Sequence, residues 1–387
     1  MNAPIATNEL IRQMVAWRQH LHANPELGNQ EKDTAAFVAE ILEAAGIEVH
    51  RGVGGNGVVG VLRGNSDQPS LGFRAELDAL PITETQACQY RSVHPERMHA
   101  CGHDGHMAML LGGAQLLAHQ RDFSATVVFI FQPDEERGSG AKAMVADGLF
   151  ERFPIDAMFA IHNLPGLETG SFAMRTGPIM ACEDIFSLTI NAKGGHAAMP
   201  HRGVDAITTA AQVVMALQTI VSRQIDPLTP AVLSITEFFT NGSRNILPGQ
   251  VVLHGEVRSY SATISQQIET TIEEIANNIC CAHGATCQLQ YNREFTATCN
   301  TAAETAYAQQ VAQSLAGTSL VTADCPALMA SDDFGIFLES RPGSYVFLGN
   351  GDSAPLHSGQ YDFNDALLKT GAEFWAALAL GYRSYPS

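Results

Sequence analysis

The sequence predicts an α/β protein whose chain is interrupted by a second, α+β unit. Helical and strand patterns alternate up to about residue 180, and the rhythm changes near residue 184. A chain of 387 residues is also longer than most single domains. We therefore expect a discontinuous main domain, residues 1–183 and 297–387, into which residues 184–296 are inserted as a lid.

The first part of the chain is predicted to form a sheet with parallel strands between helices. Apolar residues recur at helical spacing from Leu10 to Leu21, and Gly46 ends a second helical pattern. Strands separated by helices favour parallel pairing. In sheets of this kind the functional residues lie at the carboxyl ends of the strands. The expected helices are residues 8–22, 34–45, 107–119 and 139–147, and the expected strands are 57–63, 70–77, 125–131 and 157–162.

From residue 184 the predicted elements follow the order β-α-β-β-α-β, which is typical of a ferredoxin-like split. The chain then returns to the main domain with a helix, a buried strand and a C-terminal helix. The expected elements of the insertion are strands 185–192, 231–239, 251–259 and 286–292 and helices 204–221 and 265–281. After it we expect helix 303–317, strand 344–348 and helix 365–382.

Composition and charge exclude several classes of protein. The chain carries 40 acidic against 22 basic residues, and it lacks the basic patch that nucleic-acid binding needs. No apolar run approaches the roughly 18–20 residues that span a bilayer, and residues 1–10 show no secretory signal. The eight cysteines are irregularly spaced, which favours reduced thiols. We therefore expect a globular protein of the cytoplasm that binds neither nucleic acid nor membranes.

The densest group of metal-competent side chains is MHACGHDGH at residues 98–106. Cys101 and His103 lie two positions apart, and the neighbouring glycines permit a turn on which a thiolate and an imidazole converge. A helix-capping loop with surface histidines is the alternative. Three further candidates, Glu136, His162 and His357, follow or end predicted strands and so share one edge of the sheet. This shared placement favours metal binding.

Together these residues make five ligands, more than the three that one catalytic zinc usually takes. Five ligands fit two ions that share a bridge, and a thiolate can serve as the bridge. The mixed set of thiolate, imidazole and carboxylate allows Zn, Mn, Ni or Co. The predicted ligands of two divalent metal ions are Cys101, His103, Glu136, His162 and His357.

Other residues suit proton transfer and substrate binding. Glu135 follows a predicted strand and a proline and fits a general base, with a solvated acidic loop as the alternative. His196 follows two glycines in the insertion and could stabilise an oxyanion, or merely mark an exposed turn. Asn245 and Arg258 offer an amide and a cation for a substrate carboxylate. The histidines for which we expect structural or supporting roles are His20, His22, His99, His106 and His201.

These patterns resemble the two-metal aminoacylase and carboxypeptidase-like amidohydrolases of peptidase family M20, in the branch of hippurate hydrolases and indoleacetyl-amino-acid hydrolases. The resemblance runs nearly end to end, and its motifs occur in the family's order. The motifs are HANPEL (22–27), RAELDALP (74–81), MHACGHDGH (98–106), QPDEE (132–136), GGHAAMP (194–200), NILP (245–248), SDDF (331–334) and LH (356–357).

The resemblance implies a zinc-peptidase-like mixed sheet with flanking helices and a ferredoxin-like lid that also mediates dimerisation. A homodimer or homotetramer is expected. It implies that the five ligands hold two divalent ions, that Glu135 is the base, and that the insertion binds substrate. The substrate-binding residues are then His196, Asn245 and Arg258, with His196 acting in its own or a partner's site.

Two residues depart from the family pattern. Glu76 stands where Asp is usual, which we expect to change the geometry behind the ligands more than metal binding itself. Asp332 stands where Glu is common, and this departure affects any role assigned near Asp333.

The function expected is hydrolysis of the amide bond of an N-acyl amino acid, hippurate-like or N-acetyl, to a carboxylic acid and a free amino acid. A dipeptidase and a deacetylase of an N-acetylated intermediate are alternatives with the same fold. From other classes, Cys101 could be a nucleophile activated by His103 in a metal-free hydrolase, or the protein could bind acyl amino acids without catalysis. The intact base Glu135 favours the metal-dependent enzyme.

Overall fold

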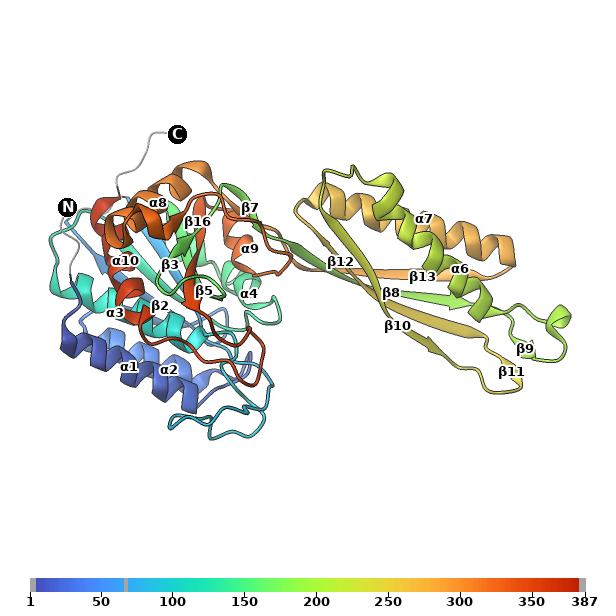
Figure 1. Ribbon diagram of the computed structural model, residues 1–387, viewed down its shortest axis with the longest axis horizontal. Helices are drawn as coiled ribbons and strands as arrows, with labels where there is room; N and C mark the ends of the chain where they lie inside the picture. Colours follow the sequence, from blue (N-terminus) through green and yellow to red (C-terminus); the bar gives the residue numbers. More distant parts are fainter. Residues whose placement is uncertain (1–4, 66–68, 383–387) are drawn as a thin grey trace. The chain divides into compact units, whose positions relative to one another are not determined.

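The computed structural model describes residues 5–65 and 69–382, and the chain divides into two compact units (Figure 1). Unit 1 is drawn from Met1–Ile179, Thr298–Ala327 and Asp332–Ser387, and unit 2 from Met180–Ala297 and Leu328–Ser331. The short Leu328–Ser331 segment belongs to unit 2 because the Ala181 N–H donates to the carbonyls of Leu328 (3.1 Å) and Ala330 (2.9 Å).

Unit 1 is built on an eight-stranded mixed sheet. Its central strands β4, β3, β5 and β16 pair in parallel, whereas β2 and β6 pair antiparallel with β4 and β16. The α/β class and the mixed sheet predicted from sequence are therefore confirmed. In spatial order the strands are β1 (Glu48–Val53), β2 (Gly57–Arg63), β4 (Thr126–Gln132), β3 (Ser70–Glu76), β5 (Ala157–Pro165), β16 (Gly343–Gly351), β6 (Phe172–Ala173) and β15 (Val321–Thr322). A separate pair joins β7 (Gly177–Met180) to β14 (Thr298–Asn300).

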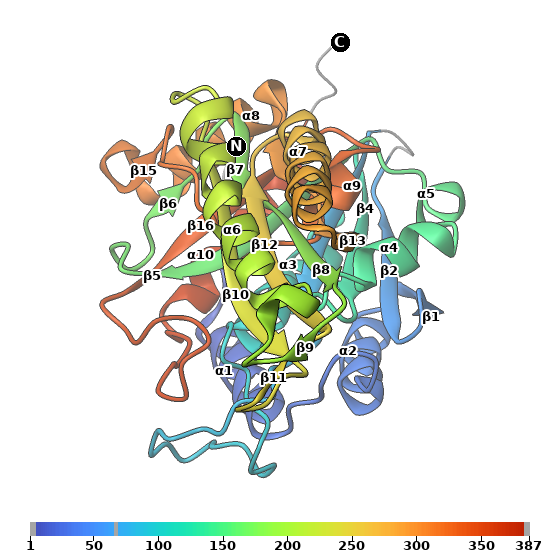
Figure 2. The same cartoon turned by 90° about the vertical axis from the view of Figure 1, so that its right-hand side faces the viewer.

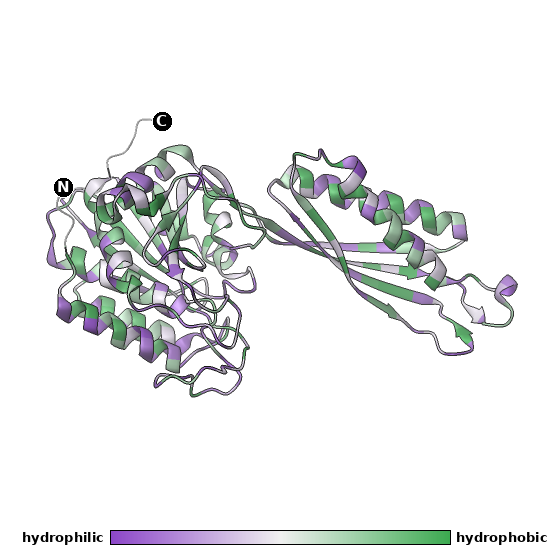
Figure 3. Cartoon of the chain, in the orientation of Figure 1, coloured by the Kyte–Doolittle hydropathy of each residue, from purple (hydrophilic) through white to green (hydrophobic). Residues whose placement is uncertain are grey.

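Alternate residues of the central strands, such as Phe73, Phe129 and Phe159, share one apolar core with several flanking helices. In Figure 3 the outer helices α1 and α2 show bands of hydrophobic and hydrophilic residues, the pattern of helices with one buried face. The helices of unit 1 are α1 (Asn8–Ala23), α2 (Lys32–Ala44), α3 (His103–His119), α4 (Gly140–Ala146), α5 (Leu149–Arg152), α8 (Ala302–Ala316), α9 (Phe334–Leu338) and α10 (Leu367–Gly381), with a 3-10 turn at Thr318–Leu320. In the described part of the chain, every helix is too short or too polar to cross a membrane.

The start of α3 differs from the sequence expectation. The helix begins at His103 rather than at residue 107, so the later histidines of the 98–106 motif form its first turn. Gly102 precedes the helix with φ 95°, and a Cβ there would lie 2.2 Å from Asn163 Nδ2. Only glycine fits this turn, which brings Cys101 and His103 to the same side. Strand β1 was missed because its mostly exposed residues show no clear alternation.

Unit 2 is a four-stranded antiparallel sheet with two helices on one face (Figures 1 and 2). Leu188 and Val251 from the sheet share its core with Val213 and Ile272 from the helices. Its elements, in chain order, are β8 (Cys182–Asn191), β9 (Gly195–His196), a 3-10 turn (Pro200–Arg202), α6 (Ala206–Thr219), a π-helical turn (Ile220–Gln224), β10 (Ala231–Thr240), β11 (Ile246–Leu247), β12 (Gln250–Ser259), α7 (Ala262–His283) and β13 (Thr286–Phe295). The strand order in the sheet is β10-β12-β8-β13, and β9 and β11 form a small second sheet.

Candidate functional site

The candidate metal ligands and base of unit 1 meet at the carboxyl edge of its parallel strands. The loop after β4 carries the two adjacent glutamates, β5 carries one histidine, and the loop after β16 carries another. The start of α3 supplies a cysteine and a third histidine. The residues that the structure brings together are Cys101, His103, Glu135, Glu136, His162 and His357.

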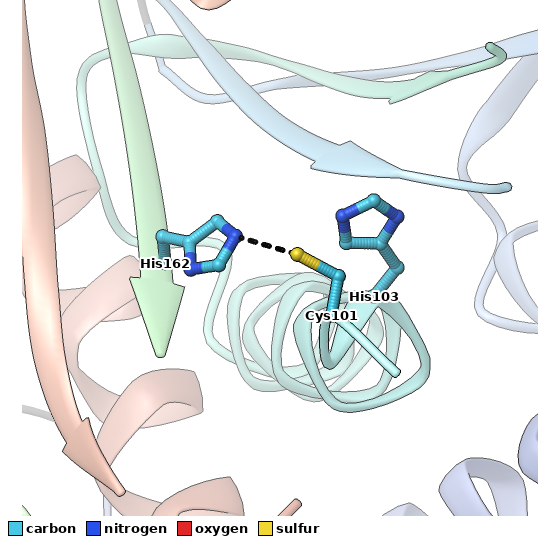
Figure 4. A group of neighbouring side chains, drawn as sticks. All are labelled: Cys101, His103 and His162. Carbon is cyan, nitrogen blue, oxygen red and sulfur yellow. Dashed lines mark hydrogen bonds between the residues drawn. The ribbon is translucent and has the colours of Figure 1, made fainter. Parts of the chain in front are cut away.

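Cys101 lies at the centre of this group. Its Sγ is 3.4 Å from His162 Nε2, and Figure 4 shows it directed at that ring, with His103 on the other side. The ligand atoms of Cys101, His103 and His162 lie within 4.8 Å of one another, as do those of Cys101, Glu136 and His357. Glu136 places Oε1 4.0 Å from His103 Nε2 and Oε2 3.5 Å from His357 Nε2. One thiol is therefore shared by two groups of three ligands.

Hydrogen bonds orient two of the histidines toward the centre. His103 Nδ1 lies 2.8 Å from the Asp78 carbonyl, and His162 Nδ1 lies 2.7 Å from the Asn163 carbonyl. Because a carbonyl only accepts, each Nδ1 donates, and in the neutral ring each Nε2 has a lone pair for a metal. Within the described residues, buried His103 Nε2 and Glu136 Oε1 have no hydrogen-bond partner. Buried atoms of this kind call for a partner, and the donor set fits divalent metal ions.

The electrostatics of the group also favour a bound cation. Burial, reinforced by the neighbouring carboxylates, raises the pKa of Cys101 and of Glu135 well above their ordinary values. Burial lowers the pKa of His162 to about 4. Burial also opposes protonation of His103, but attraction to Glu76 and the hydrogen bond to Asp78 outweigh it and raise its pKa to about 10. An excess of buried acidic groups is what a bound cation offsets.

Two loops of the site contain residues in the left-handed region, which is uncommon for residues other than glycine. Asp134, just before Glu135, has φ 48°, and His357 has φ 60°. Asp134 is held by Asn29 Nδ2 (2.9 Å) and Arg137 Nε (2.7 Å), and the His357 N–H donates to the Ala100 carbonyl (2.8 Å). Such conformations persist only where surrounding bonds impose them, so these loops are held rather than free.

Sequence reasoning left Asp78 without a role. Its Oδ2 accepts the Glu136 N–H at 3.0 Å while its carbonyl accepts from His103, so one residue positions two candidate ligands. A role for Asp78 could have been predicted from the sequence, because Asp78 directly follows strand β3 within the 74–81 motif. Asn163, also unassigned, donates from Nδ2 to the Cys101 carbonyl at 2.7 Å. The side-chain partners of Asn163 are Cys101 before α3, His106 in α3 and Tyr361 after β16, and sequence patterns do not show these contacts.

Comparison with known proteins identifies the family. Residues 72–381 match peptidase family M20/M25/M40. The chain belongs to this family. It is 40% identical over 366 residues to the hippurate hydrolase of Campylobacter jejuni. This match covers 94% of this chain and 95% of that protein. It is 42% identical over 288 residues to the N-acyl-L-amino acid amidohydrolase of Geobacillus stearothermophilus, with coverage of 74% and 77%.

A solved structure supports the same assignment. The YXEP protein of Bacillus subtilis, described as a dinuclear metal-binding peptidase of family M20, matches with a TM-score of 0.86 and 29% identity. The match covers 97% of this chain and 98% of that chain. The family resemblance expected from the motifs is therefore confirmed.

Both departures of this M20 protein from the family pattern lie in one buried network. Arg74, fully buried, is bonded to Glu76, to Asp332 (3.1 Å) and to Asp333 (2.9 Å). Glu76 also accepts from His106 Nδ1 at 2.8 Å, since the Asn163 N–H donates to the other ring nitrogen. Arg74 on β3, the strand that leads to Asp78, thus contacts three carboxylates, of which Glu76 lies on the same strand and Asp332 and Asp333 precede α9.

The candidate residues of unit 2 fall into two places. His196 on β9 pairs with Ile246 on β11, and the Asn245 carbonyl accepts the Ala197 N–H at 3.0 Å, so His196 and Asn245 are neighbours. The Ala198 N–H donates to His196 Nδ1 at 3.1 Å, so neutral His196 carries its proton on Nε2. The exposed ring can therefore donate a hydrogen bond from Nε2.

Arg258 lies away from this pair. It is aligned with Glu183 at the start of β8, whereas β9 follows the end of β8 at Asn191. At about 3.3 Å per residue, Glu183 and Asn191 are about 26 Å apart along β8. The Arg258 guanidinium is bonded to Glu183 (2.8 Å) and Glu256. A substrate carboxylate would therefore have to compete with these two partners.

Proposed function

We propose that this M20 protein hydrolyses the amide bond of N-acyl amino acids with two divalent metal ions at the Cys101 centre. The observation that carries the proposal is the position of Cys101 in both three-ligand groups, with Glu135 Oε2 3.9 Å from the ligand atom His103 Nε2. Cys101, His103 and Glu136 would be among the residues that hold the ions. The names of the Campylobacter and Geobacillus relatives support N-acyl amino acids as the substrate class.

Each residue of the site has a separate role in the proposed hydrolysis. Two bound divalent ions would supply Lewis acidity toward the acyl carbonyl and a nucleophilic water at neutral pH. Glu135 takes the proton of that water and passes it to the leaving nitrogen. His196 donates from Nε2 to the developing oxyanion when the lid closes. The α-carboxylate is held by Asn245, the neighbour of His196, where both come from one chain, or by Arg258 where a partner chain supplies His196. Burial of Glu135, with an exposed fraction of 6%, keeps bulk water from competing for this proton.

Cys101 is poorly suited to act as a nucleophile. Burial and four nearby carboxylates raise its pKa, whereas nucleophilic cysteines have a lowered pKa. The neighbouring His162 has a lowered pKa and would not supply the imidazolium partner of a thiolate. His103, the activating histidine of that alternative, has a raised pKa, but its Nε2 faces Glu135 (3.9 Å) and Glu136 (4.0 Å), so carboxylates already balance its charge.

The proposal is tested by release of glycine from benzoylglycine. The protein is stripped with a chelator, dialysed, and reloaded in parallel with Zn, Mn, Ni or Co. We expect release that depends on added metal, and panels of acyl groups and amino acids then define the preference. If the protein releases no glycine from benzoylglycine but cleaves a dipeptide or an N-acetylated amino acid, it is a dipeptidase or deacetylase with the same fold. Equal activity of the stripped protein would overturn the metal mechanism.

Cys101→Ala is expected to lower bound metal as well as turnover. Because the thiol belongs to both ligand groups, its loss weakens both positions. Metal per chain is measured by elemental analysis after dialysis against buffer without metal. The control is Cys325→Ala, which removes a buried thiol that belongs to neither group. Unchanged metal content in Cys101→Ala would refute the ligand role.

His196→Ala is expected to lower kcat by about 10- to 1,000-fold with bound metal unchanged, because one oxyanion donor is lost. The matched control is His201→Ala, which removes another exposed histidine five positions away and should leave kcat unchanged. Steady-state kinetics on benzoylglycine give the result. Equal kcat for wild type and His196→Ala would remove His196 from the mechanism. Mixing inactive His196→Ala with inactive Glu135→Gln chains distinguishes an own-site from a partner-site histidine, since only the second restores activity.

We propose further that residues 184–296 act as lid and dimer contact of a cytoplasmic enzyme. The support is strand β10, which lies at an edge of its sheet and exposes Phe238 (41%) and Phe239 (54%). Exposed apolar residues on an unpaired edge are typical of a contact between subunits. None of the eight cysteines is in a disulfide, which supports a reducing compartment. A homodimer or homotetramer is expected in sedimentation analysis.

A further inference from the structure

A second group of metal-competent side chains lies in unit 1, apart from the Cys101 centre. His22 is near the end of α1, and Glu84 and Cys88 belong to the segment between β3 and α3. His22 and Glu84 are buried, with exposed fractions of 1% and 3%, and Cys88 is half-buried. None of the three has a part in the proposed hydrolysis.

The distances in this group suit a tetrahedral zinc site. Glu84 Oε1 lies 3.4 Å from His22 Nε2 and 3.4 Å from Cys88 Sγ, and the ligand atoms of all three lie within 4.8 Å of one another. With zinc–ligand bonds of about 2.0–2.3 Å, neighbouring ligands of a tetrahedral ion are about 3.3–3.6 Å apart. Two of the three separations already have this value, so small side-chain movements would complete the site.

The second ring nitrogen of His22 has the partner that metal-bound histidines have. His22 Nδ1 lies 2.9 Å from Asp104 Oδ2, which leaves Nε2 facing Glu84 and Cys88. A carboxylate on the far nitrogen fixes the ring and increases the basicity of the ligating nitrogen. Asp104 is itself held by Arg18, whose Nη1 is 3.7 Å away.

We propose that His22, Glu84 and Cys88 bind one zinc ion, in addition to the ions at the Cys101 centre. Thiolate, imidazole and carboxylate are all zinc ligands, and the half-buried Cys88 leaves the fourth position open to a water. Binding releases one proton from the Cys88 thiol and one from a protonated His22, so the local charge is unchanged when the divalent ion enters. No oxidant or reductant is required.

The bound ion would join α1 to the segment that leads into the Cys101 loop. Glu84 Oε2 accepts the Ser92 N–H at 2.8 Å, and Met98 pairs with Leu80, so this segment is folded back on itself. The ion adds a cross-link between His22 and this fold. This cross-link would stabilise the segment that leads to the catalytic ligands.

The test compares zinc bound per chain in wild type and Cys88→Ser after saturation and dialysis. We expect one zinc fewer in Cys88→Ser. The matched control is Cys287→Ser, another half-buried cysteine, which should bind as much zinc as wild type. Equal zinc in Cys88→Ser and wild type would overturn the proposal, whether or not the protein hydrolyses benzoylglycine.

A second measurement uses the wild-type chain and does not depend on the folding of a variant. Zinc-loaded and chelated proteins are alkylated under native conditions, and the modified cysteines are identified by mass spectrometry. Zinc should slow alkylation of Cys88 at least tenfold while leaving the exposed Cys281 and Cys299 unchanged. Equal alkylation of Cys88 with and without zinc would also overturn the proposal.

Discussion

Glu135→Gln is expected to reduce kcat by about 10²- to 10⁴-fold, because it removes the proposed base without removing a ligand. Its Oε2 lies 3.9 Å from His103 Nε2, and its side chain is buried, so Gln fits the same space. Metal per chain should match wild type. Kinetics on benzoylglycine and elemental analysis of the same samples give both results.

The neighbouring glutamate provides the control. Glu136→Gln should lose metal together with activity, because Glu136 contacts both His103 and His357. Glu135→Gln with full turnover would refute the base assignment. Glu135→Gln with low turnover and low metal would instead place Glu135 among the ligands.

Glu135→Gln should also change stability in a pH-dependent way in the chelated protein. Burial and neighbouring carboxylates raise the pKa of Glu135 in the folded chain, so its ionisation opposes folding. This cost is absent below the ordinary glutamate pKa and grows as the pH rises toward the raised value. The variant should therefore gain stability over wild type between pH 5 and pH 8 in urea unfolding.

Arg74→Met is expected to lower the free energy of unfolding by about 3–5 kcal/mol, the cost of leaving buried charges uncompensated. Arg74 is fully buried and is bonded to Glu76, Asp332 and Asp333. Met has a similar volume, so the loss reflects charge rather than a cavity. Urea unfolding measures the change, and Arg12→Met, with 75% of the native side chain exposed, is the neutral control.

The loss should be larger at pH 8 than at pH 5. Burial raises the pKa of Asp333 to about 7, against the opposing effect of Arg74. At pH 5 Asp333 is therefore largely protonated and needs no cation, whereas at pH 8 it is ionised. An unfolding midpoint that is unchanged in Arg74→Met at both pH values would show that the carboxylates are not held by this arginine.

Much of the main sheet could be predicted because its strands are buried and apolar along their length. Strand β2 has the predicted bounds, β3 ends one residue earlier than predicted, and β4 begins and ends one residue later. Strand β1 lacks a clear alternation of buried and exposed residues. The two-residue strands β6 and β15 are defined by their pairing with neighbouring strands, which no local pattern shows. The early start of α3 depended on Gly102, whose close contact with Asn163 is a tertiary feature.

The sequence by itself determined the family, the mixed α/β class and which side chains could carry chemistry, because strand periodicity and motif spacing are local properties. Tertiary structure alone decided the partners of those side chains. Arg74 meets Asp333 across 259 positions, Asp78 orients both His103 and Glu136, and the length of β8 separates Arg258 from His196. These contacts depend on which strands lie side by side, and strand neighbours are set by packing of the whole core rather than by any short stretch of sequence.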